Sequence, residues 1–306
     1  MTGAALVTGA GGFVGAAIAE RLVATGWTVQ ATDAAFDAPT RARLARAQLI
    51  EAPLPAALAD AQSADVVIHA AFVTASPAER GETAAAHIRT NTALLLDTLA
   101  WARAGGAGRF VFLSSSGVFG DAGPDGAGAD EDTPATATDP YSAAKRAGEV
   151  LLAGAADAGF ATLSLRLGPL FGPHEVARPT RPRPSLVARM LAEARATGRI
   201  TVATPDARRD WTFLPDLARA VDWLLTLPRV QPGLLHLTSG QALRDAELAA
   251  LIAAQMPGTQ VALAPDPAAP PPRPVMTTRH PLPGFAWTPT ADALATLPPR
   301  PGIAAQ

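Results

Sequence analysis

The stretch from residue 4 to residue 33 constrains the fold most, because a strand, a glycine loop, a helix and a second strand follow one another without interruption. Residues 4–8 are a short apolar run, typical of a strand that is buried on both faces. Three glycines follow at intervals of three residues, namely Gly9, Gly12 and Gly15. Such a loop lets the backbone approach a pyrophosphate, whose oxygens accept hydrogen bonds from the free N–H groups at the helix N-terminus. The order of elements therefore predicts a dinucleotide site that includes Phe13 and Val14.

The second strand, expected over residues 27–32, ends at Asp33. A carboxylate about 20 residues beyond the glycines accepts hydrogen bonds from the adenosine ribose hydroxyls and repels a 2′-phosphate. No arginine follows Asp33 directly, since Ala34 and Ala35 stand there. We therefore predict NAD rather than NADP as the cofactor. The alternative is an aspartate that caps a helix or a turn.

Further strands and helices alternate along the chain. A strand expected over residues 65–72 contains Ala70 and Ala71 near its end, whose small side chains leave room for a cofactor. Residues 109–113 form the next strand, and the three serines 114–116 stand at its carboxyl end, where ligands bind in open α/β sheets. This alternation predicts the α/β class with a doubly wound, Rossmann-like parallel sheet.

The character of the chain changes after the next strand. The segment 168–184 holds five prolines, which a regular element would not tolerate. We expect residues 1–167 and about 211–240 to form the dinucleotide-binding domain. Residues 168–210 and about 241–306 are expected to form a smaller, mixed substrate-binding domain.

Tyr141 and Lys145 are the only tyrosine and the only lysine among the 306 residues. Four residues apart on a helix, they share one face. An ammonium in that position favours the phenolate and is expected to lower the pKa of the phenol toward neutrality. Tyr141 is therefore a candidate general acid and base. The alternative is an ordinary surface pair on an amphipathic helix.

The chain contains 25 basic residues, of which all but Lys145 are arginine, and its one asparagine is Asn91. Tyrosine, lysine and asparagine have codons rich in A and T, whereas abundant alanine, glycine, proline and arginine indicate a GC-biased genome. This bias would replace tyrosine, lysine and asparagine wherever another residue serves, so we expect each of them to survive only where its chemistry is needed. The bias thus adds Asn91 to the candidates.

Arginines in the second half of the chain are candidates for binding an anionic substrate, because guanidinium pairs bidentately with phosphate or carboxylate. They are Arg178, Arg181, Arg183, Arg208 and Arg209. The alternative is a solvated, arginine-rich segment in a chain that uses arginine for almost every cation.

The remaining composition argues against several classes of protein. A net charge of −2 and a pI near 6.2 give no electrostatic case for nucleic acid or for an anionic membrane. There are no cysteines and the five histidines show no ligand spacing, so we expect neither disulfides nor a metal site. No cleavable leader and no long apolar run is visible, which favours a cytoplasmic protein. The oligomeric state stays open, with a homodimer among the options.

Together, the glycine loop, Asp33, the serine-ended strand and the Tyr141–Lys145 pair resemble the short-chain dehydrogenase/reductase superfamily. The likeness is closer to its extended branch, the NAD-dependent epimerase/dehydratase family, and covers nearly the whole chain. The matching segments are TGAGGFVG, DVVIHAA, RFVFLSSSGVFG, YSAAK, RLGPLFGP, RRDWTFLPDLARAV and GFAWTPT.

The resemblance implies that Tyr141 is the acid and base, while Lys145 lowers its pKa and holds the nicotinamide ribose. Ser115 is the serine expected to bind the reacting oxygen, with Ser116 as the near alternative, and Asn91 is expected to face the cofactor side. The implied reaction is hydride transfer between the nicotinamide and a carbinol carbon of a sugar or sugar nucleotide.

Departures from the family pattern keep other interpretations open. Pro169 takes a place often held by an asparagine that contacts the substrate, and Glu51 and Ala52 replace a pair that often lies near adenine. Ser116 and Gly117 stand where dehydratases carry acidic residues, which argues against a dehydratase. A dehydrogenase of a smaller polyhydroxy acid or carbonyl compound therefore remains an alternative, as does a non-catalytic dinucleotide-sensing protein.

Overall fold

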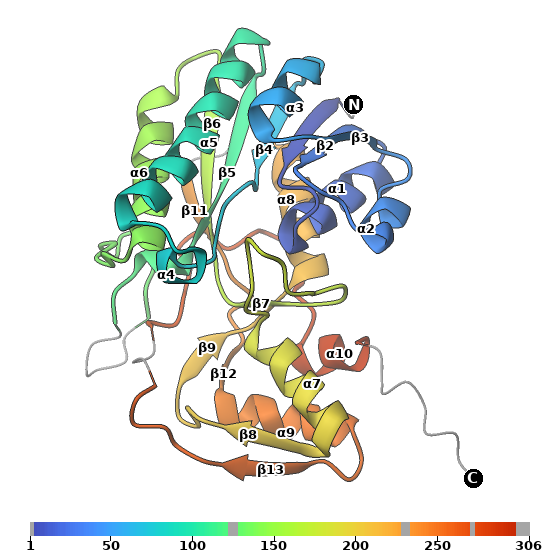
Figure 1. The fold of residues 1–306 in the computed structure, drawn as a ribbon, viewed down its shortest axis with the longest axis vertical. Coiled ribbons are helices and arrows are strands. Elements are labelled where there is room, and N and C mark those ends of the chain that lie inside the picture. The colour runs from blue at the N-terminus through green and yellow to red at the C-terminus, as the bar shows by residue number, and fades with distance from the viewer. Residues whose placement is uncertain (1–2, 122–127, 228–232, 270–272, 298–306) are drawn as a thin grey trace.

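The computed structural model describes residues 3–121, 128–227, 233–269 and 273–297, and its centre is a seven-stranded sheet (Figure 1). The strand order is β11-β6-β5-β4-β1-β2-β3, and every neighbouring pair is parallel. The strands are β1 (Ala4–Thr8), β2 (Thr28–Asp33), β3 (Gln48–Glu51), β4 (Val66–His69), β5 (Arg109–Ser115), β6 (Ala161–Leu167) and β11 (Leu234–Leu237). This architecture confirms the predicted α/β class with a doubly wound sheet.

The strand order reverses at β1, whose two neighbours are β2 and β4. The chain first runs outward from β1 to β3 and then crosses back to β4 on the other side of β1. At such a switch point the loops after neighbouring strands diverge, which leaves a crevice at the carboxyl ends of the strands. The glycine loop follows β1 directly and therefore lies in this crevice.

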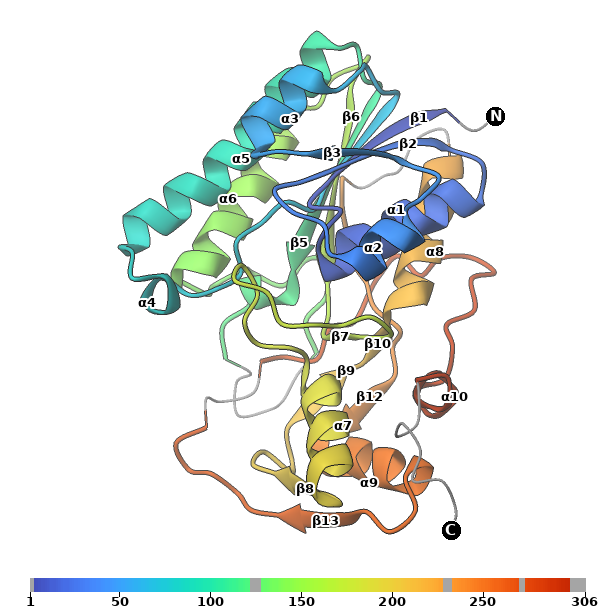
Figure 2. The same cartoon turned by 45° about the vertical axis from the view of Figure 1, so that its right-hand side comes forward.

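Helices cover both faces of the sheet (Figures 1 and 2). One face carries α1 (Phe13–Ala24), α2 (Ala38–Arg43) and α8 (Leu214–Thr226), and the other carries α3 (Leu54–Asp60), α5 (Ala84–Ala104) and α6 (Pro140–Ala155). Two short helices, α4 (Pro77–Arg80) and the 3₁₀ turn η1 (Ser116–Val118), follow β4 and β5 at the same end of the sheet. Each face has its own apolar core, one around Ile18 and Val221 and the other around Leu95 and Phe112.

A smaller part of the molecule lies below the carboxyl ends of the sheet in Figure 1. It contains α7 (Leu186–Thr197), α9 (Asp245–Gln255) and α10 (Thr290–Ala295). Three strand pairs complete it: β8 (Arg199–Val202) with β13 (Gln260–Leu263), β9 (Arg208–Asp210) with β12 (Ala242–Arg244), and β7 (Leu170–Phe171) with β10 (Thr212–Phe213). A separate apolar core that includes Met190, Ile200 and Leu248 holds these elements together. None of the helices in the described ranges is both long and apolar enough to cross a membrane.

Candidate active site

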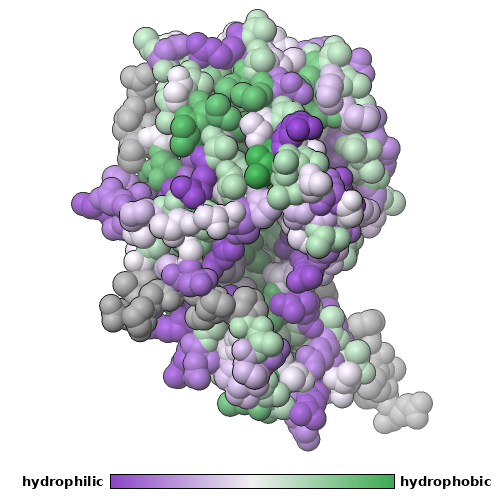
Figure 3. All heavy atoms as spheres, turned by 60° about the vertical axis from the view of Figure 1, so that its left-hand side comes forward, coloured by the Kyte–Doolittle hydropathy of each residue, from purple (hydrophilic) through white to green (hydrophobic). Residues whose placement is uncertain are grey.

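A pocket of about 830 Å³ lies between the carboxyl ends of the sheet and the smaller part of the molecule. Its walls come from the glycine loop, the end of β5, the first turns of α6 and α7, and the strands β8 and β9. The surface is visibly hollowed at this level, between the upper and lower parts of the molecule (Figure 3). Within the described ranges, no three His, Asp or Glu side chains gather so that they could hold a metal ion.

The glycine loop is shaped for close approach of a ligand to the backbone. Gly9 has a φ of +69°, and a Cβ atom there would lie 2.6 Å from the backbone of Ala70. A Cβ atom at Gly15 would lie 2.2 Å from the carbonyl oxygen of Gly9. No side chain caps the N-terminus of α1, and its first turn carries no acidic residue. The glycines thus let the loop turn tightly against neighbouring backbone, and the turn leads directly into a helix N-terminus, which attracts an anion such as pyrophosphate.

Most of the predicted cofactor contacts line this pocket together. They are Gly9, Gly12, Phe13, Val14, Gly15, Ala70, Tyr141 and Lys145. Ala71 lies just behind the wall, where its backbone N–H donates to the Thr8 hydroxyl at 3.3 Å.

Asp33 lies at the end of β2, beside the glycine loop. One carboxylate oxygen accepts a hydrogen bond from Gly11 N at 2.9 Å, and the other accepts one from Ala34 N at 2.7 Å. Burial raises the pKa of this carboxyl, while the backbone hydrogen bonds and the positive charge of Arg178 act in the opposite direction. Asp33 is thus fixed where the sequence predicts a ribose-binding carboxylate, with a guanidinium close enough to influence it.

Replacing Asp33 with alanine should reduce the preference for NAD over NADP by about 10-fold or more, since one charged contact is worth that much in affinity. The variant loses the charge that repels a 2′-phosphate, and Arg178 remains nearby to attract it. Dissociation constants for NAD and NADP, measured by calorimetry, test this result. The exposed Asp60 on α3 provides the control substitution. An unchanged ratio in Asp33→Ala would mean that this carboxylate does not set the preference.

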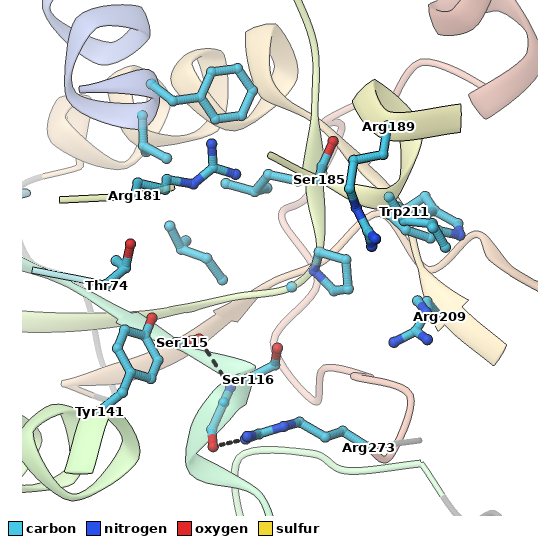
Figure 4. A pocket seen from close by; sticks show the side chains of 18 of the residues that line it. Thr74, Ser115, Ser116, Tyr141, Arg181, Ser185, Arg189, Arg209, Trp211 and Arg273 are labelled. Atoms are coloured by element: carbon cyan, nitrogen blue, oxygen red, sulfur yellow. Dashed lines mark hydrogen bonds between the residues drawn. The ribbon is translucent and has the colours of Figure 1, made fainter. Parts of the chain in front are cut away.

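Tyr141 enters the pocket from the first turn of α6. Asp139 starts this helix, because its side chain accepts a hydrogen bond from Ser142 N at 3.0 Å. The Tyr141 ring packs edge-on against Phe72, with ring centroids 5.4 Å apart. The side chain of Ser115 is close enough to lower the pKa of the phenol, and its Oγ accepts a hydrogen bond from Gly117 N at 2.9 Å. Ser115 and Ser116 both line the pocket (Figure 4), and of the two it is Ser115 that influences the pKa of Tyr141.

The pKa of Tyr141 is raised rather than lowered, contrary to the expectation from the sequence. The Lys145 ammonium donates to the carbonyl oxygen of Leu113 at 2.6 Å and lies 5.8 Å from the centroid of the Tyr141 ring. Burial raises the pKa of the phenol, although the Ser115 hydrogen bond and the charge of Arg273 lower it in part. Desolvation outweighs charge at this site because it penalises the phenolate directly.

The surroundings of Lys145 are largely aromatic. Its Nζ lies 3.6 Å from the centroid of the Phe72 ring and 4.9 Å from that of Phe112. Burial lowers the pKa of Lys145 to about 7, and the negative charge of Glu149 one turn further along α6 opposes this shift. The ammonium therefore exchanges its proton close to neutral pH. Glu149 is itself fixed by a buried pair with Arg166, at 2.8 Å.

Asn91 lies behind the pocket wall and holds the backbone of Val73. Its Oδ1 accepts a hydrogen bond from Val73 N at 2.8 Å, and its Nδ2 donates to Val73 O at 3.2 Å. Asn91 is 1% exposed and is not among the pocket-lining residues. Its amide satisfies both backbone groups of the segment that carries Phe72 and Thr74 into the pocket.

The predicted substrate arginines divide into two groups. Arg178, Arg181 and Arg209 line the pocket. Arg183 points away, since its side chain is 82% exposed and pairs with Glu79 at 2.8 Å. Arg209 is held by Asp245, with Nε 2.9 Å from Oδ1.

Two further arginines of the pocket escaped the sequence analysis. Arg189 on α7 lines it without a side-chain hydrogen bond or ion pair to any described residue. Arg273 donates to the carbonyl oxygens of Gly117 and Phe119, and its charge acts on Tyr141. Arg273 stands in a proline-rich stretch without periodicity, so no local pattern indicated its position. Figure 4 shows Arg189 and Arg209 on one side of the pocket and Tyr141 on the other.

The reversed strand order, the glycine loop and the pocket beside it define a Rossmann-type dinucleotide-binding enzyme. The chain belongs to the NAD-dependent epimerase/dehydratase family, because residues 5–235 match the family described as "NAD dependent epimerase/dehydratase family". NAD is accordingly its cofactor, as the sequence predicted. No curated protein matches the sequence.

Solved structures share this fold over almost the whole chain. UDP-glucose-4-epimerase from Stenotrophomonas maltophila, with bound NAD and formylated UDP-arabinopyranose, is 21% identical, with 96% of each chain covered and a TM-score of 0.81. MoeE5 in complex with UDP-glucuronic acid and NAD is 23% identical, covering 96% of this chain and 97% of that one, with a TM-score of 0.76. UDP-glucose 4-epimerase from Thermotoga maritima is 20% identical, with coverage of 95% and 96% and a TM-score of 0.75.

Proposed function

We propose that this protein is an NAD-dependent epimerase or oxidoreductase that acts on a carbinol carbon of a nucleotide sugar. One observation carries the proposal: the same pocket is lined by a glycine loop that suits a pyrophosphate, by Tyr141 and Ser115, and by arginines on the side opposite the tyrosine. The similar folds described with bound UDP-sugars support this substrate class.

In this proposal the chain positions the substrate and moves one proton, while NAD supplies the hydride chemistry. When the carbinol is oxidised, the Tyr141 oxygen takes the proton of its hydroxyl group, and when the carbonyl is reduced again, Tyr141 returns that proton. Ser115, which lines the same pocket as Tyr141, is assigned to bind and orient the reacting oxygen. Burial raises the pKa of Tyr141 and favours the protonated phenol. This form serves as the acid in the reduction, whereas the oxidation requires the phenol to lose its proton first.

Lys145 has three roles in this account. Its hydrogen bond to the carbonyl oxygen of Leu113 ties α6 to the end of β5, where Ser115 lies. Its pKa of about 7 lets it exchange a proton at neutral pH. The nicotinamide ribose is the group that we assign to it, following the family resemblance.

The arginines opposite Tyr141 are assigned to the diphosphate of the substrate. Arg189 and Arg209 lie on that side of the pocket, whereas Arg273 lies beside Gly117, close enough to Tyr141 for its charge to act on the phenol (Figure 4). Guanidinium groups bind phosphate oxygens in pairs, so two or three of them suffice for a diphosphate. A sugar attached to that diphosphate would extend toward Tyr141 and Ser115.

Replacing Arg189 with glutamine should weaken binding of UDP by about 10-fold, because one charge-assisted contact is lost. Affinity for NAD and the unfolding temperature should stay the same, since this side chain has no hydrogen bond or ion pair with the described residues. Arg199→Gln, at an exposed position on β8, is the matched control. Calorimetric titration with UDP measures the effect. Equal UDP affinity in Arg189→Gln and wild type would remove Arg189 from the substrate site.

A second candidate is a dehydrogenase of a smaller polyhydroxy acid. It is favoured by Pro169, which lines the pocket and has no side-chain amide with which to contact a sugar. The arginines would then bind a carboxylate instead of a diphosphate. A panel of nucleotide sugars and sugar acids separates the two, because an epimerase converts its substrate without net formation of NADH and a dehydrogenase accumulates NADH. Turnover of a free sugar acid, with no reaction of any nucleotide sugar, would overturn the first proposal.

A further inference from the structure

A proline-rich strap, residues 172–185, crosses from the smaller part of the molecule to the glycine loop, below α1 and α2 (Figures 1 and 2). The carbonyl oxygen of Thr180 accepts hydrogen bonds from the backbone N–H groups of Thr74 and Ala75, both at 2.9 Å. Arg178 pairs with Asp37 at the start of α2, at 2.6 Å. The strap is thus fastened on both sides of the crevice in which the dinucleotide binds.

Within this strap, Arg181 is held in a defined position. Its backbone N–H and carbonyl exchange hydrogen bonds with those of Arg178, both at 2.9 Å, which closes a tight turn. Its Nη2 pairs with Glu175 at 2.6 Å, and the Glu175 side chain is only 2% exposed. Glu175 also accepts from the backbone N–H and the hydroxyl of Ser185, so it ties the Arg181 guanidinium to the end of the strap. A donor fixed in this way loses little entropy when it binds a ligand.

The Arg181 guanidinium lies against the residue that opens α1. Its Cζ is 5.1 Å from the centroid of the Phe13 ring, and Phe13 is the first residue of that helix. The other terminal nitrogen, Nη1, is buried and has no hydrogen-bond partner among the described residues. A buried, unpaired guanidinium N–H is costly, because it has lost its water without gaining an acceptor. The structure therefore presents a cationic donor, ready for an acceptor, beside the helix N-terminus.

We infer that Arg181 binds the pyrophosphate of NAD, and that it supplies the positive charge which the glycine loop itself lacks. Residues 9–15 contain no charged side chain. A pyrophosphate with two negative charges would then receive N–H groups from the N-terminus of α1 on one side and the guanidinium from the strap on the other. The sequence had assigned Arg181 to the substrate, whereas its contact with Phe13 points to the cofactor. This inference rests on NAD binding and not on the proposed substrate.

The inference also explains why the strap is fastened near Asp33. The charge of Arg178 acts on the Asp33 carboxyl, which is assigned to the adenosine ribose. Arg181 lies at Phe13, where the pyrophosphate is expected, so the two strap arginines would lie along the bound dinucleotide. NAD and the strap would then stabilise each other, because each fixes the other in the crevice.

Titrations with three ligands test this assignment by separating the two diphosphates that the pocket could hold. In Arg181→Gln, affinity for ADP-ribose and for NAD should fall by about 10-fold or more. Affinity for adenosine, which has no phosphate, and for UDP should change by less than about two-fold. Raising the salt concentration should weaken ADP-ribose binding less in this variant than in wild type, because one charge contact is gone.

Two further variants complete the experiment. Arg183→Gln removes an exposed arginine from the same strap and should leave all affinities unchanged. Arg181→Lys keeps a cation and should retain more ADP-ribose affinity than Arg181→Gln. This variant keeps the test decisive if Arg181→Gln folds poorly. The assignment is overturned if ADP-ribose affinity is unchanged in Arg181→Gln, if UDP affinity falls instead, or if adenosine affinity falls as much as that for ADP-ribose. Equal losses in the lysine and glutamine variants would also contradict it.

Discussion

Tyr141→Phe should lower turnover by about 100- to 10,000-fold, the usual contribution of a positioned acid or base. The ring and its edge-on contact with Phe72 remain, so the fold and the affinity for NAD should change little. What disappears is the phenolic oxygen, which in this proposal exchanges a proton with the reacting oxygen. Steady-state rates on the identified substrate and calorimetric titration with NAD measure the two effects.

The two neighbouring serines provide the matched pair for this prediction. Ser115→Ala should lower turnover by about 100-fold, because it removes a hydroxyl that lowers the pKa of the phenol and that is assigned as a donor to the reacting oxygen. Ser116→Ala removes a pocket-lining hydroxyl without that effect on the phenol, so its effect should be small. The reverse ranking would exchange the roles of the two serines. Turnover in Tyr141→Phe at the wild-type rate would remove the phenol from the mechanism.

Lys145→Met is expected to lower turnover by about 100-fold or more and to change how stability depends on pH. In the folded protein the pKa of Lys145 is lowered from 10.5 to about 7 by burial. Between these pH values the unfolded chain binds a proton that the folded chain does not, so this group makes stability rise as the pH rises. Below pH 7 both states hold the proton, and the contribution of this group is constant.

The methionine variant lacks this titration, while its side chain suits the pocket formed by Phe72 and Phe112. The unfolding temperature of wild type, relative to the variant, should therefore increase between pH 7 and about pH 10 and stay level below pH 7. Circular dichroism melts of the two proteins over this pH range measure the difference. A difference that is constant at all pH values would show that the lysine has an ordinary pKa in the folded protein.

The sheet and the glycine loop were predictable because their causes are local. Buried parallel strands are short apolar runs, and a glycine with positive φ, such as Gly9, interrupts them at a defined place. Asp33 and Tyr141 lie at the ends of elements whose type the sequence indicates, so their positions follow from the topology. The same logic placed Ser115 at the carboxyl end of β5.

Other parts of the site depend on contacts between distant segments. Arg273 meets the carbonyl oxygen of Gly117 from 156 residues away, out of a segment without a periodic pattern. Arg189 reaches the pocket only through the packing of α7 against the rest of the molecule, which no local pattern indicates. The direction of the Tyr141 pKa was wrong because the sequence gives the charge of Lys145 and does not give the burial of the phenol. Arg181 was expected to bind the substrate since nothing local places it over Phe13.

Rapid mixing of the NAD-loaded protein with its substrate, followed by the absorbance of the reduced nicotinamide, tests the role of Tyr141 most directly. In wild type we expect reduced cofactor to form in a fast phase, which becomes slower when the reacting carbinol carbon carries deuterium. Tyr141→Phe should form no reduced cofactor over the same period, although it still binds NAD and substrate. Formation of reduced cofactor at the wild-type rate in Tyr141→Phe would contradict the account, because the proton would then leave by a route that does not involve this phenol.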